Sequence, residues 1–328
     1  MARQRISSTP KKKIVGNAQR KETTIQQAYS MFAINQKEKG NSKPTLAFYD
    51  RSYKKLALIT EDGTQLVNVI TEIGFQDRFI ESLGNVNQQT INAYLRGFRS
   101  FGNYCESMGL IEMFNCPIKE IDPPLKQVYT NAELKILTRK PDIDDFVAFR
   151  DYNIIVLLLS TGARTNTILN LHIFDVDLDE GYIIFNTTKA KKVVRVGLER
   201  KAQRDLGEYI SYWRSGEGIR PDDYLFCNSY GEKLSRSGLS KTIASYNRSR
   251  GVDKTSIHLF RHTFAKNWIT SGGDLISLAR VLTHSELEMV KRYSNLYGSD
   301  IKAEIEEHST MSQLKTQSGQ TMKTKKRK

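Results

Sequence analysis

Prolines divide this chain into two parts, and this division constrains the fold more than any other feature of the sequence. Three prolines lie close together near the middle of the chain, and two of them, Pro123 and Pro124, are consecutive. Consecutive prolines exclude a helix, because each proline pushes the preceding residue out of the helical region. We therefore expect a linker at residues 116–127, between a segment at 23–115 and a longer segment at 128–308.

The first segment carries the three- and four-residue apolar spacing of amphipathic helices. Its clearest helix is expected at about 88–108, with Asn87 as the N-cap and Gly109 as the stop signal. Three further helices are expected before it, at about 24–33, 43–59 and 71–83. This segment therefore reads as all-helical.

In the second segment, the spacing of apolar residues changes once from a helical to a strand-like pattern. Apolar spacing predicts helices over most of it, at about 130–137, 144–160, 165–171, 200–213, 235–250, 259–270, 274–282 and 285–296. Between them, β-rich runs at 182–185 and 193–196 predict a hairpin with a lysine-loaded tip. The ends, residues 1–22 and 309–328, are polar and basic without a hydrophobic period, so we expect a flexible arm and a flexible tail. The predicted fold is mainly α with a small β-hairpin or sheet, in two domains.

Composition indicates the kind of partner. The chain has 50 Lys and Arg against 36 Asp and Glu, and this net charge of +14 favours a polyanion, with nucleic acid as the first candidate. Its three cysteines have no metal-ligand spacing, which favours buried thiols in a reducing compartment over a disulfide scaffold or a zinc site. The longest apolar run, residues 154–159, is too short to span a bilayer, and no apolar segment follows the basic N-terminus. We expect a cytoplasmic protein without a membrane partner.

Side chains suited to chemistry on a phosphodiester lie toward the C-terminus. His258 and Arg261 are three residues apart, His284 follows, and Tyr293 comes nine residues later; Arg164 can supply a second guanidinium. A guanidinium stays protonated and binds phosphate oxygens bidentately, an imidazole can transfer protons, and a phenol can act as a nucleophile. Such a set needs no metal ion, and we expect no metal or other cofactor.

Three lysines fall at or beside the predicted hairpin tip: Lys189, Lys191 and Lys192. The simplest role for them is a solvated or phosphate-contacting loop. A sharper one is general-acid catalysis, in which a lysine protonates the departing 5′ oxygen once neighbouring positive charge has lowered its pKa. The residues alone do not choose among the three.

Together, these motifs resemble the catalytic domain of the tyrosine recombinases, the phage-integrase-like family. The family pattern runs Thr-Gly-x-Arg, a hairpin Gly-Lys-Gly-x-Lys, His-x-x-Arg-His, Leu-Gly-His-Ser, and a tyrosine nine residues after the last histidine. The matching segments here are 161–164, 188–192, 258–262, 282–285 and Tyr293. The resemblance covers about residues 24–300, because residues 90–96 are similar to the helical, SAM-like core-binding domain of the family.

The resemblance implies a mechanism. Tyr293 would attack the scissile phosphate to form a 3′-phosphotyrosine and release a 5′ hydroxyl, His258 would accept the tyrosine proton, and Lys189 would protonate the leaving oxygen. Three side chains would hold the phosphate in the transition state: Arg164, Arg261 and His284.

Three departures from the family pattern accompany these motifs. Thr167 stands where the family often has an acidic residue, Thr283 replaces the glycine before the last histidine, and the hairpin lacks both glycines. The third departure leaves Lys191 and Lys192 open as alternatives to Lys189.

The resemblance also implies partners and a biological role. These are double-stranded DNA recombination sites, a homotetramer assembled on two sites, exchange of a C-terminal segment within 297–308, and accessory DNA-bending proteins. The reaction would serve integration, excision or replicon resolution. Two alternatives remain. A catalytically idle DNA-binding regulator on the same scaffold would lack Tyr293 or either arginine, and a type IB-like topoisomerase would not need defined sites.

Overall fold

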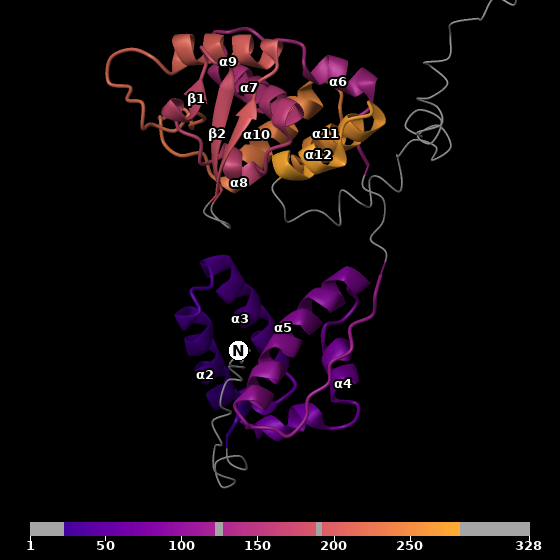
Figure 1. Cartoon of the computed structure of the whole chain (residues 1–328). Helices are drawn as coiled ribbons and strands as arrows, with labels where there is room; N and C mark the ends of the chain where they lie inside the picture. Colours follow the sequence, from indigo (N-terminus) through magenta and orange to yellow (C-terminus); the bar gives the residue numbers. More distant parts are fainter. Residues whose placement is uncertain (1–22, 122–126, 188–191, 283–328) are drawn as a thin grey trace, which may run out of the picture. The chain divides into compact units, whose positions relative to one another are not determined.

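The structure, a computed structural model, describes residues 23–121, 127–187 and 192–282 (Figure 1). The chain divides into two compact units after Pro124, and each has its own hydrophobic core. The described elements are mostly helices, with one three-stranded sheet, which confirms the predicted fold class. No helix in these three ranges is long and apolar enough to cross a membrane.

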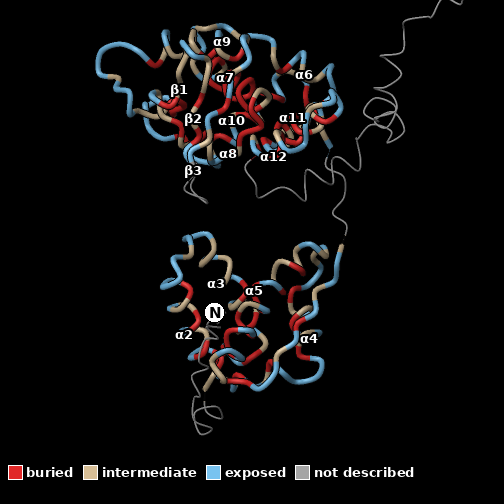
Figure 2. The backbone as a smooth tube through the Cα atoms, in the orientation of Figure 1, coloured by how far each residue is buried: buried red, intermediate tan, exposed pale blue. Residues whose placement is uncertain are grey.

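The described part of the first unit is a small helical assembly. Its elements are α2 (Ile25–Glu38), α3 (Lys43–Ala57), η1 (Glu61–Gly63), η2 (Val67–Thr71), α4 (Phe75–Ser82) and α5 (Gln88–Ser107). Helix α3 contacts both α2 and α5, and the core between them is largely aromatic, with Phe32 in contact with Phe101 and Tyr49. Buried residues line the inner sides of these helices (Figure 2).

Local sequence signals set most helix ends in this unit. Thr24 caps α2 in a reciprocal capping box with Gln27, and the Asn87 side chain accepts from the Thr90 N–H at 2.9 Å at the start of α5. The predicted helix at 71–83 was wrong at its N-terminus. Gly74 has φ +79°, which breaks the helical path, so α4 starts only at Phe75 and is preceded by a separate 3-10 turn.

The described part of the second unit contains seven α-helices. They are α6 (Asn131–Leu137), α7 (Phe146–Thr161), α8 (Thr165–Ile168), α9 (Arg200–Trp213), α10 (Arg236–Ser249), α11 (His258–Thr270) and α12 (Leu275–Val281). Helix α7 is buried without interruption from Phe149 to Leu158 and contacts α9, α10 and α11 (Figure 2). All seven lie where the apolar spacing predicts them, although the helix after Arg164 ends at Ile168, three residues early.

An antiparallel sheet completes the second unit, with η3 (Ile173–Asp175) leading into it. Its strands are β1 (Val176–Asp177), β2 (Tyr182–Thr187) and β3 (Lys192–Gly197), in the order β1-β2-β3. The predicted hairpin is confirmed, with Ile183 opposite Val196 and Phe185 opposite Val194. Ile183 and Phe185, two residues apart on β2, are both buried, as expected when one face of a strand is covered.

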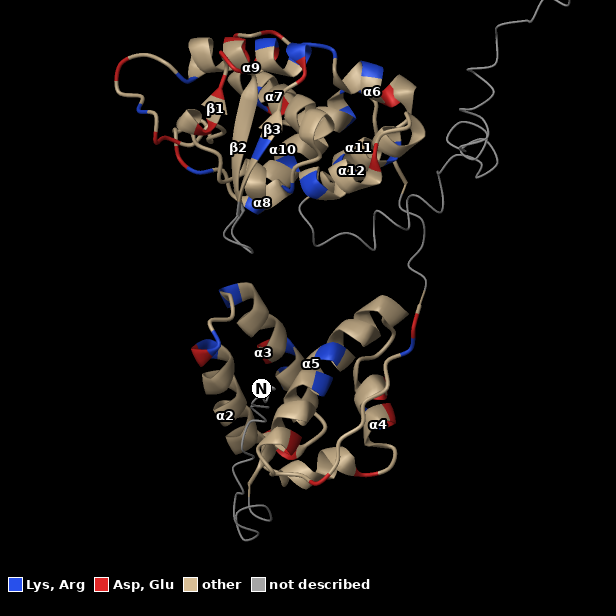
Figure 3. Cartoon of the chain, viewed as in Figure 1, with Lys and Arg blue, Asp and Glu red and all other residues tan. Residues whose placement is uncertain are grey.

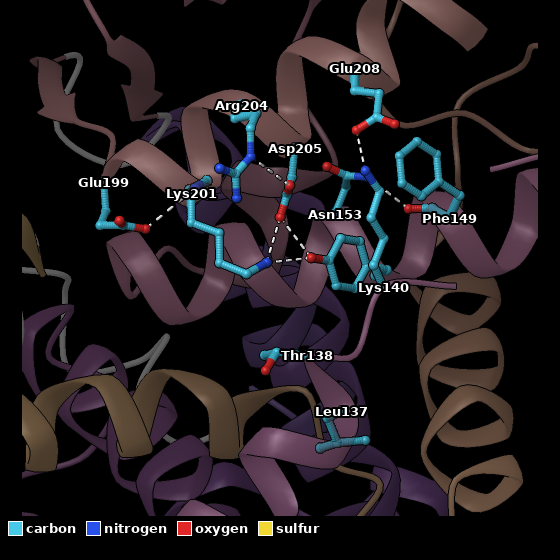
Figure 4. A network of polar contacts seen from close by, with 12 residues as sticks. Leu137, Thr138, Lys140, Phe149, Asn153, Glu199, Lys201, Arg204, Asp205 and Glu208 are labelled. Carbon is cyan, nitrogen blue, oxygen red and sulfur yellow. Dashed lines mark hydrogen bonds and ion pairs between the residues drawn. The ribbon is translucent and has the colours of Figure 1, made fainter. Parts of the chain in front are cut away.

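A polar network ties α9 to α7 (Figure 4). The Lys201 ammonium lies 2.5 Å from Asp205 Oδ2 and donates to the Tyr152 hydroxyl, which itself donates to Asp205 at 2.6 Å. Burial alone would raise the pKa of Asp205, but the bonds from Lys201 and Tyr152 outweigh it and hold the pKa below its usual value. Because Tyr152 and Asp205 are both buried, this network stabilises the contact between the two helices.

Candidate active site

Arg261 joins three separate segments of the second unit. It lies on α11 with only 5% of its surface exposed. One guanidinium nitrogen donates to the Gly162 carbonyl at the end of α7, and another donates to the Leu282 carbonyl at the end of α12, at 2.9 Å. Because both acceptors are neutral carbonyls, these two bonds orient the guanidinium without neutralising its charge.

Gly162 makes the first of these contacts through an unusual backbone conformation. It follows the last residue of α7 with φ +61° and ψ +21°, and its N–H donates to the Leu158 carbonyl at 2.9 Å. A Cβ atom at this position would lie 2.9 Å from Leu282 Cδ2 and closer still to Phe264 Cδ1. Both the left-handed conformation and the close packing therefore require glycine, and together they place the carbonyl that Arg261 uses.

Arg164 follows Gly162 by two residues and occupies the N-cap position of α8. Its backbone is extended, with φ −75° and ψ +147°, and its side chain is half-buried. Its carbonyl accepts from the N–H groups of Thr167 at 2.9 Å and Ile168 at 3.1 Å. Backbone hydrogen bonds thus fix the bend between α7 and α8. This bend contains both Arg164 and Gly162, whose carbonyl accepts a hydrogen bond from Arg261.

His258 is the first residue of α11 and is exposed. It lies one helical turn before Arg261, so the two residues are neighbours on the helix surface. Arg236, the first residue of α10, places a guanidinium nitrogen 3.3 Å from His258 Nε2.

The start of the second unit anchors α11. The Tyr129 ring stacks on Phe260, with centroids 4.4 Å apart, and its backbone N–H donates to the Thr263 hydroxyl at 3.0 Å. The Tyr129 hydroxyl donates to the Lys254 carbonyl at 3.0 Å, and burial raises the pKa of this phenol to about 12. Tyr129 therefore holds α11 in place as a neutral, buried side chain.

The other side of α11 packs against α12. Three aromatic residues spaced four apart form an apolar stripe on α11: Phe260 and Phe264 are buried and Trp268 is half-buried. Phe264 shares a small cluster with Leu278 and Leu282. This contact fixes the end of α12, where the second carbonyl acceptor of Arg261 lies.

Three of the six predicted site residues are described: Arg164, His258 and Arg261. The structure brings Arg261 to the turn that carries Arg164 and leaves His258 one turn away. Lys189, His284 and Tyr293 lie outside the described residues.

Sequence reasoning missed three contributors to this site. Two are the backbone carbonyls of Gly162 and Leu282, whose only sequence signal is their position two residues before Arg164 and His284. The third is Arg236, which sequence spacing does not distinguish from other basic residues.

A second candidate surface lies on the first unit, where two packed helices carry basic residues (Figure 3) that are exposed. Arg51 and Lys54 are three residues apart on α3, and Arg96 and Arg99 are three apart on α5. The two helices approach closely at Gly97, where a Cβ atom would lie 2.6 Å from Ser52 Cβ. Exposed basic residues at helical spacing are suited to phosphate contacts, which position a protein on a duplex.

Solved structures share this fold. The recombinase XerH in a post-cleavage complex with its difH substrate superposes with a TM-score of 0.65 at 22% identity, covering 87% of this chain and 85% of that one. The integrase of transposon Tn1549 in complex with transposon right-end DNA gives a TM-score of 0.68 at 18% identity, covering 87% of this chain and 99% of that one.

Sequence comparisons point to the same group of proteins. The tyrosine recombinase XerD of Staphylococcus epidermidis is 29% identical over 302 residues, which cover 85% of this chain and 96% of the relative. The tyrosine recombinase XerC of Chlamydia caviae is 27% identical over 218 residues, covering 65% of this chain and 69% of the relative. A model of the phage integrase family matches residues 127–299, more than half of the chain. The chain therefore belongs to the phage integrase family of tyrosine recombinases.

Proposed function

We propose that the chain is a site-specific DNA recombinase that cleaves and rejoins strands through a covalent 3′-phosphotyrosine. The Tyr293 oxygen attacks the scissile phosphorus, and the bond from phosphorus to the 5′ oxygen breaks. The tyrosine loses its proton and the 5′ oxygen gains one, so a free 5′ hydroxyl is released. Attack by a 5′ hydroxyl on the phosphotyrosine reverses these steps, and no ATP is consumed because one phosphate ester replaces another.

The contacts of Arg261 carry this proposal. Its guanidinium is bonded to the carbonyl two residues before Arg164 and to the carbonyl two residues before His284 in the sequence. The segments that contain Gly162, Arg261 and Leu282 therefore meet at the buried guanidinium of Arg261, although the first and the last are more than 100 residues apart in the sequence. This convergence supports Arg164, Arg261 and His284 as the groups that hold the phosphate while negative charge builds on its oxygens.

Proton transfer is assigned to two further side chains. His258, beside Arg261 on α11, accepts the proton of Tyr293. Lys189, between the ends of β2 and β3, protonates the 5′ oxygen, with Lys191 and Lys192 as the alternatives. The confirmed hairpin supports this assignment because it sets residues 188–191 as the connection between paired strands.

The DNA partner follows from the relatives and from the charge of the chain. XerH and the Tn1549 integrase were solved with their DNA substrates, and the first unit of this chain exposes basic residues on α3 and α5. Recombination between two duplexes requires four strand cleavages, and each copy supplies one nucleophile. We therefore propose a homotetramer on two sites, with accessory DNA-bending proteins as further partners.

A trapping assay tests the proposal. The probe is a nicked duplex carrying DNA that flanks the gene of this protein, incubated in EDTA. We expect a covalent protein–DNA complex at an undiminished rate, because two guanidiniums and His284 stabilise the charge that a metal ion would otherwise stabilise. Loss of the complex in EDTA and its recovery with magnesium would reject the metal-free mechanism.

Variants make the assay specific. Arg261→Lys should lower the cleavage rate by roughly 10²–10³, because an ammonium cannot reproduce the planar fork of donors. Arg204→Lys is the matched control, since this side chain is 73% exposed on α9, and it should cleave normally. Relaxation of a supercoiled plasmid that lacks any cognate site would instead favour a topoisomerase.

A further inference from the structure

Arg236 makes a contact that the proposed function does not use. It is the first residue of α10, next to the N-cap Ser235, and its side chain is exposed. Its guanidinium nitrogen lies 3.3 Å from His258 Nε2, and among the described residues no carboxylate pairs with it. Cations are unfavourable at the N-terminus of a helix, and α10 has no acidic residue in its first turn to compensate. The stability of α10 therefore does not explain an arginine at this position.

The contact restricts the chemical state of His258. A guanidinium only donates hydrogen bonds, so Nε2 must accept with its lone pair. A neutral imidazole that accepts at Nε2 carries its proton on Nδ1, and a protonated imidazole has no acceptor at all. Arg236 therefore favours the neutral Nδ1–H form of His258 and covers the lone pair that would take up a proton.

A DNA phosphate competes for the same guanidinium. An arginine binds a phosphate with two parallel charge-assisted hydrogen bonds, which are stronger than a single bond to a neutral ring nitrogen. A phosphate that reaches Arg236 would draw the guanidinium from His258 and expose Nε2.

We propose that Arg236 is a positioning residue for His258: it holds Nε2 in the DNA-free protein and releases it when it binds a DNA phosphate. The released nitrogen then accepts the proton of Tyr293, so the base becomes available only once DNA is present. This inference rests on the proposed role of His258 in strand cleavage.

Nitrogen NMR of the full chain with labelled histidines reads the tautomer directly. The protein carries Tyr293→Phe so that no strand is cut, and His258→Gln identifies the His258 signals. We expect the Nδ1–H tautomer in DNA-free protein and a mixture of tautomers in Arg236→Ala. Arg200→Ala is the matched control, because Arg200 is also the exposed first residue of a 14-residue helix, α9, and it should leave His258 unchanged. A His258 tautomer that is the same with and without Arg236 would overturn the proposal.

A duplex added to the same sample tests the release. With Arg236 present, DNA should shift the Nε2 resonance of His258 toward that of an acceptor nitrogen without a guanidinium donor, and in Arg236→Ala the added DNA should change this resonance little. An Nε2 resonance that does not move when DNA is added would show that the arginine stays on the histidine, which contradicts the release.

Cleavage rates at saturating DNA test whether Arg236 acts through His258. His258→Ala should slow cleavage by roughly 10²–10⁴, the usual contribution of a general base. Adding Arg236→Ala to that variant should not lower the cleavage rate further. If the rate losses of the two single variants multiply in the double variant, the proposal is overturned. If even the unmodified protein forms no covalent complex, the proposed function fails, while the tautomer in DNA-free protein still decides whether the Arg236–His258 contact exists.

Discussion

Replacing Gly162 with alanine should damage both the stability of the second unit and its chemistry. Gly162 has φ +61°, a conformation that costs a residue with a Cβ atom about 1–2 kcal/mol. The new methyl group would also lie 2.9 Å from Leu282 Cδ2 and nearer to Phe264, so both side chains must move. Overpacking of this kind typically costs about 1–3 kcal/mol.

The two contributions together give about 2–5 kcal/mol, a large part of the roughly 5–15 kcal/mol that stabilises a typical protein. For a unit of this size, each kcal/mol lowers the melting temperature by about 2–4 °C, so we expect a fall of about 4–20 °C. Strand cleavage should fall as well, even at a temperature where the variant is folded. The reason is that the substitution disturbs Gly162 and Leu282, whose carbonyls orient Arg261.

Calorimetry of the full chain measures the first effect, and the trapping assay at low temperature measures the second. Gly207→Ala is the matched control, because Gly207 lies inside α9 and its new Cβ atom would meet Leu178 only at an ordinary 3.5 Å. That change should be neutral or stabilise by about 0.5–1 kcal/mol. If Gly162→Ala melts and cleaves like the unmodified protein, the account of Arg261 positioning is refuted.

Three further predictions follow from charge and burial. If the protein contacts on the order of 6–10 phosphates, its affinity for DNA should fall roughly 10³–10⁵-fold between 50 and 200 mM salt, and a flat salt titration would contradict this. Burial raises the pKa of Cys105 to about 12 and of Cys116 to about 11, so these free thiols should resist a disulfide reagent at pH 8 until the chain unfolds; rapid labelling of native protein would argue against their burial. Because the folded-state pKa of Asp205 is lowered, its contribution is present above its unfolded pKa of about 3.9 and is lost as the pH falls. Asp205→Asn should therefore weaken the acid sensitivity of urea unfolding, and an unchanged pH profile would count against the network in Figure 4.

Local signals account for most of the fold that the sequence predicts. Asn87 and Gly109 bound α5 because a cap and a left-handed glycine act on their own neighbours. By the same rules a left-handed glycine, Gly74, precedes α4, but the apolar spacing alone predicted a helix that begins before this glycine, at residue 71. Strand β1 was missed because two residues, Val176 and Asp177, are too few to show alternation.

The site could be predicted only where its side chains lie at the spacing of a known sequence motif. Arg164, His258 and Arg261 could be chosen from their motifs, and the structure describes all three. The two carbonyls that orient Arg261 could not be predicted, because every residue has a backbone carbonyl and no residue type marks one that accepts such a bond. The bond from Arg261 to Gly162 joins positions 99 residues apart, and only the packing of α11 against α7 brings them together.

The choice of nucleophile tests the account most directly. Tyr293 and Tyr297 are four residues apart, and only the nine-residue interval from His284 favours the first. Trapping the covalent complex on a nicked duplex, digesting it and sequencing the modified peptide by mass spectrometry would identify the attached residue. We expect the phosphodeoxynucleotide on Tyr293, with no covalent complex from Tyr293→Phe and a normal one from Tyr297→Phe. A nucleotide on Tyr297 would contradict the assignment of the whole C-terminal motif.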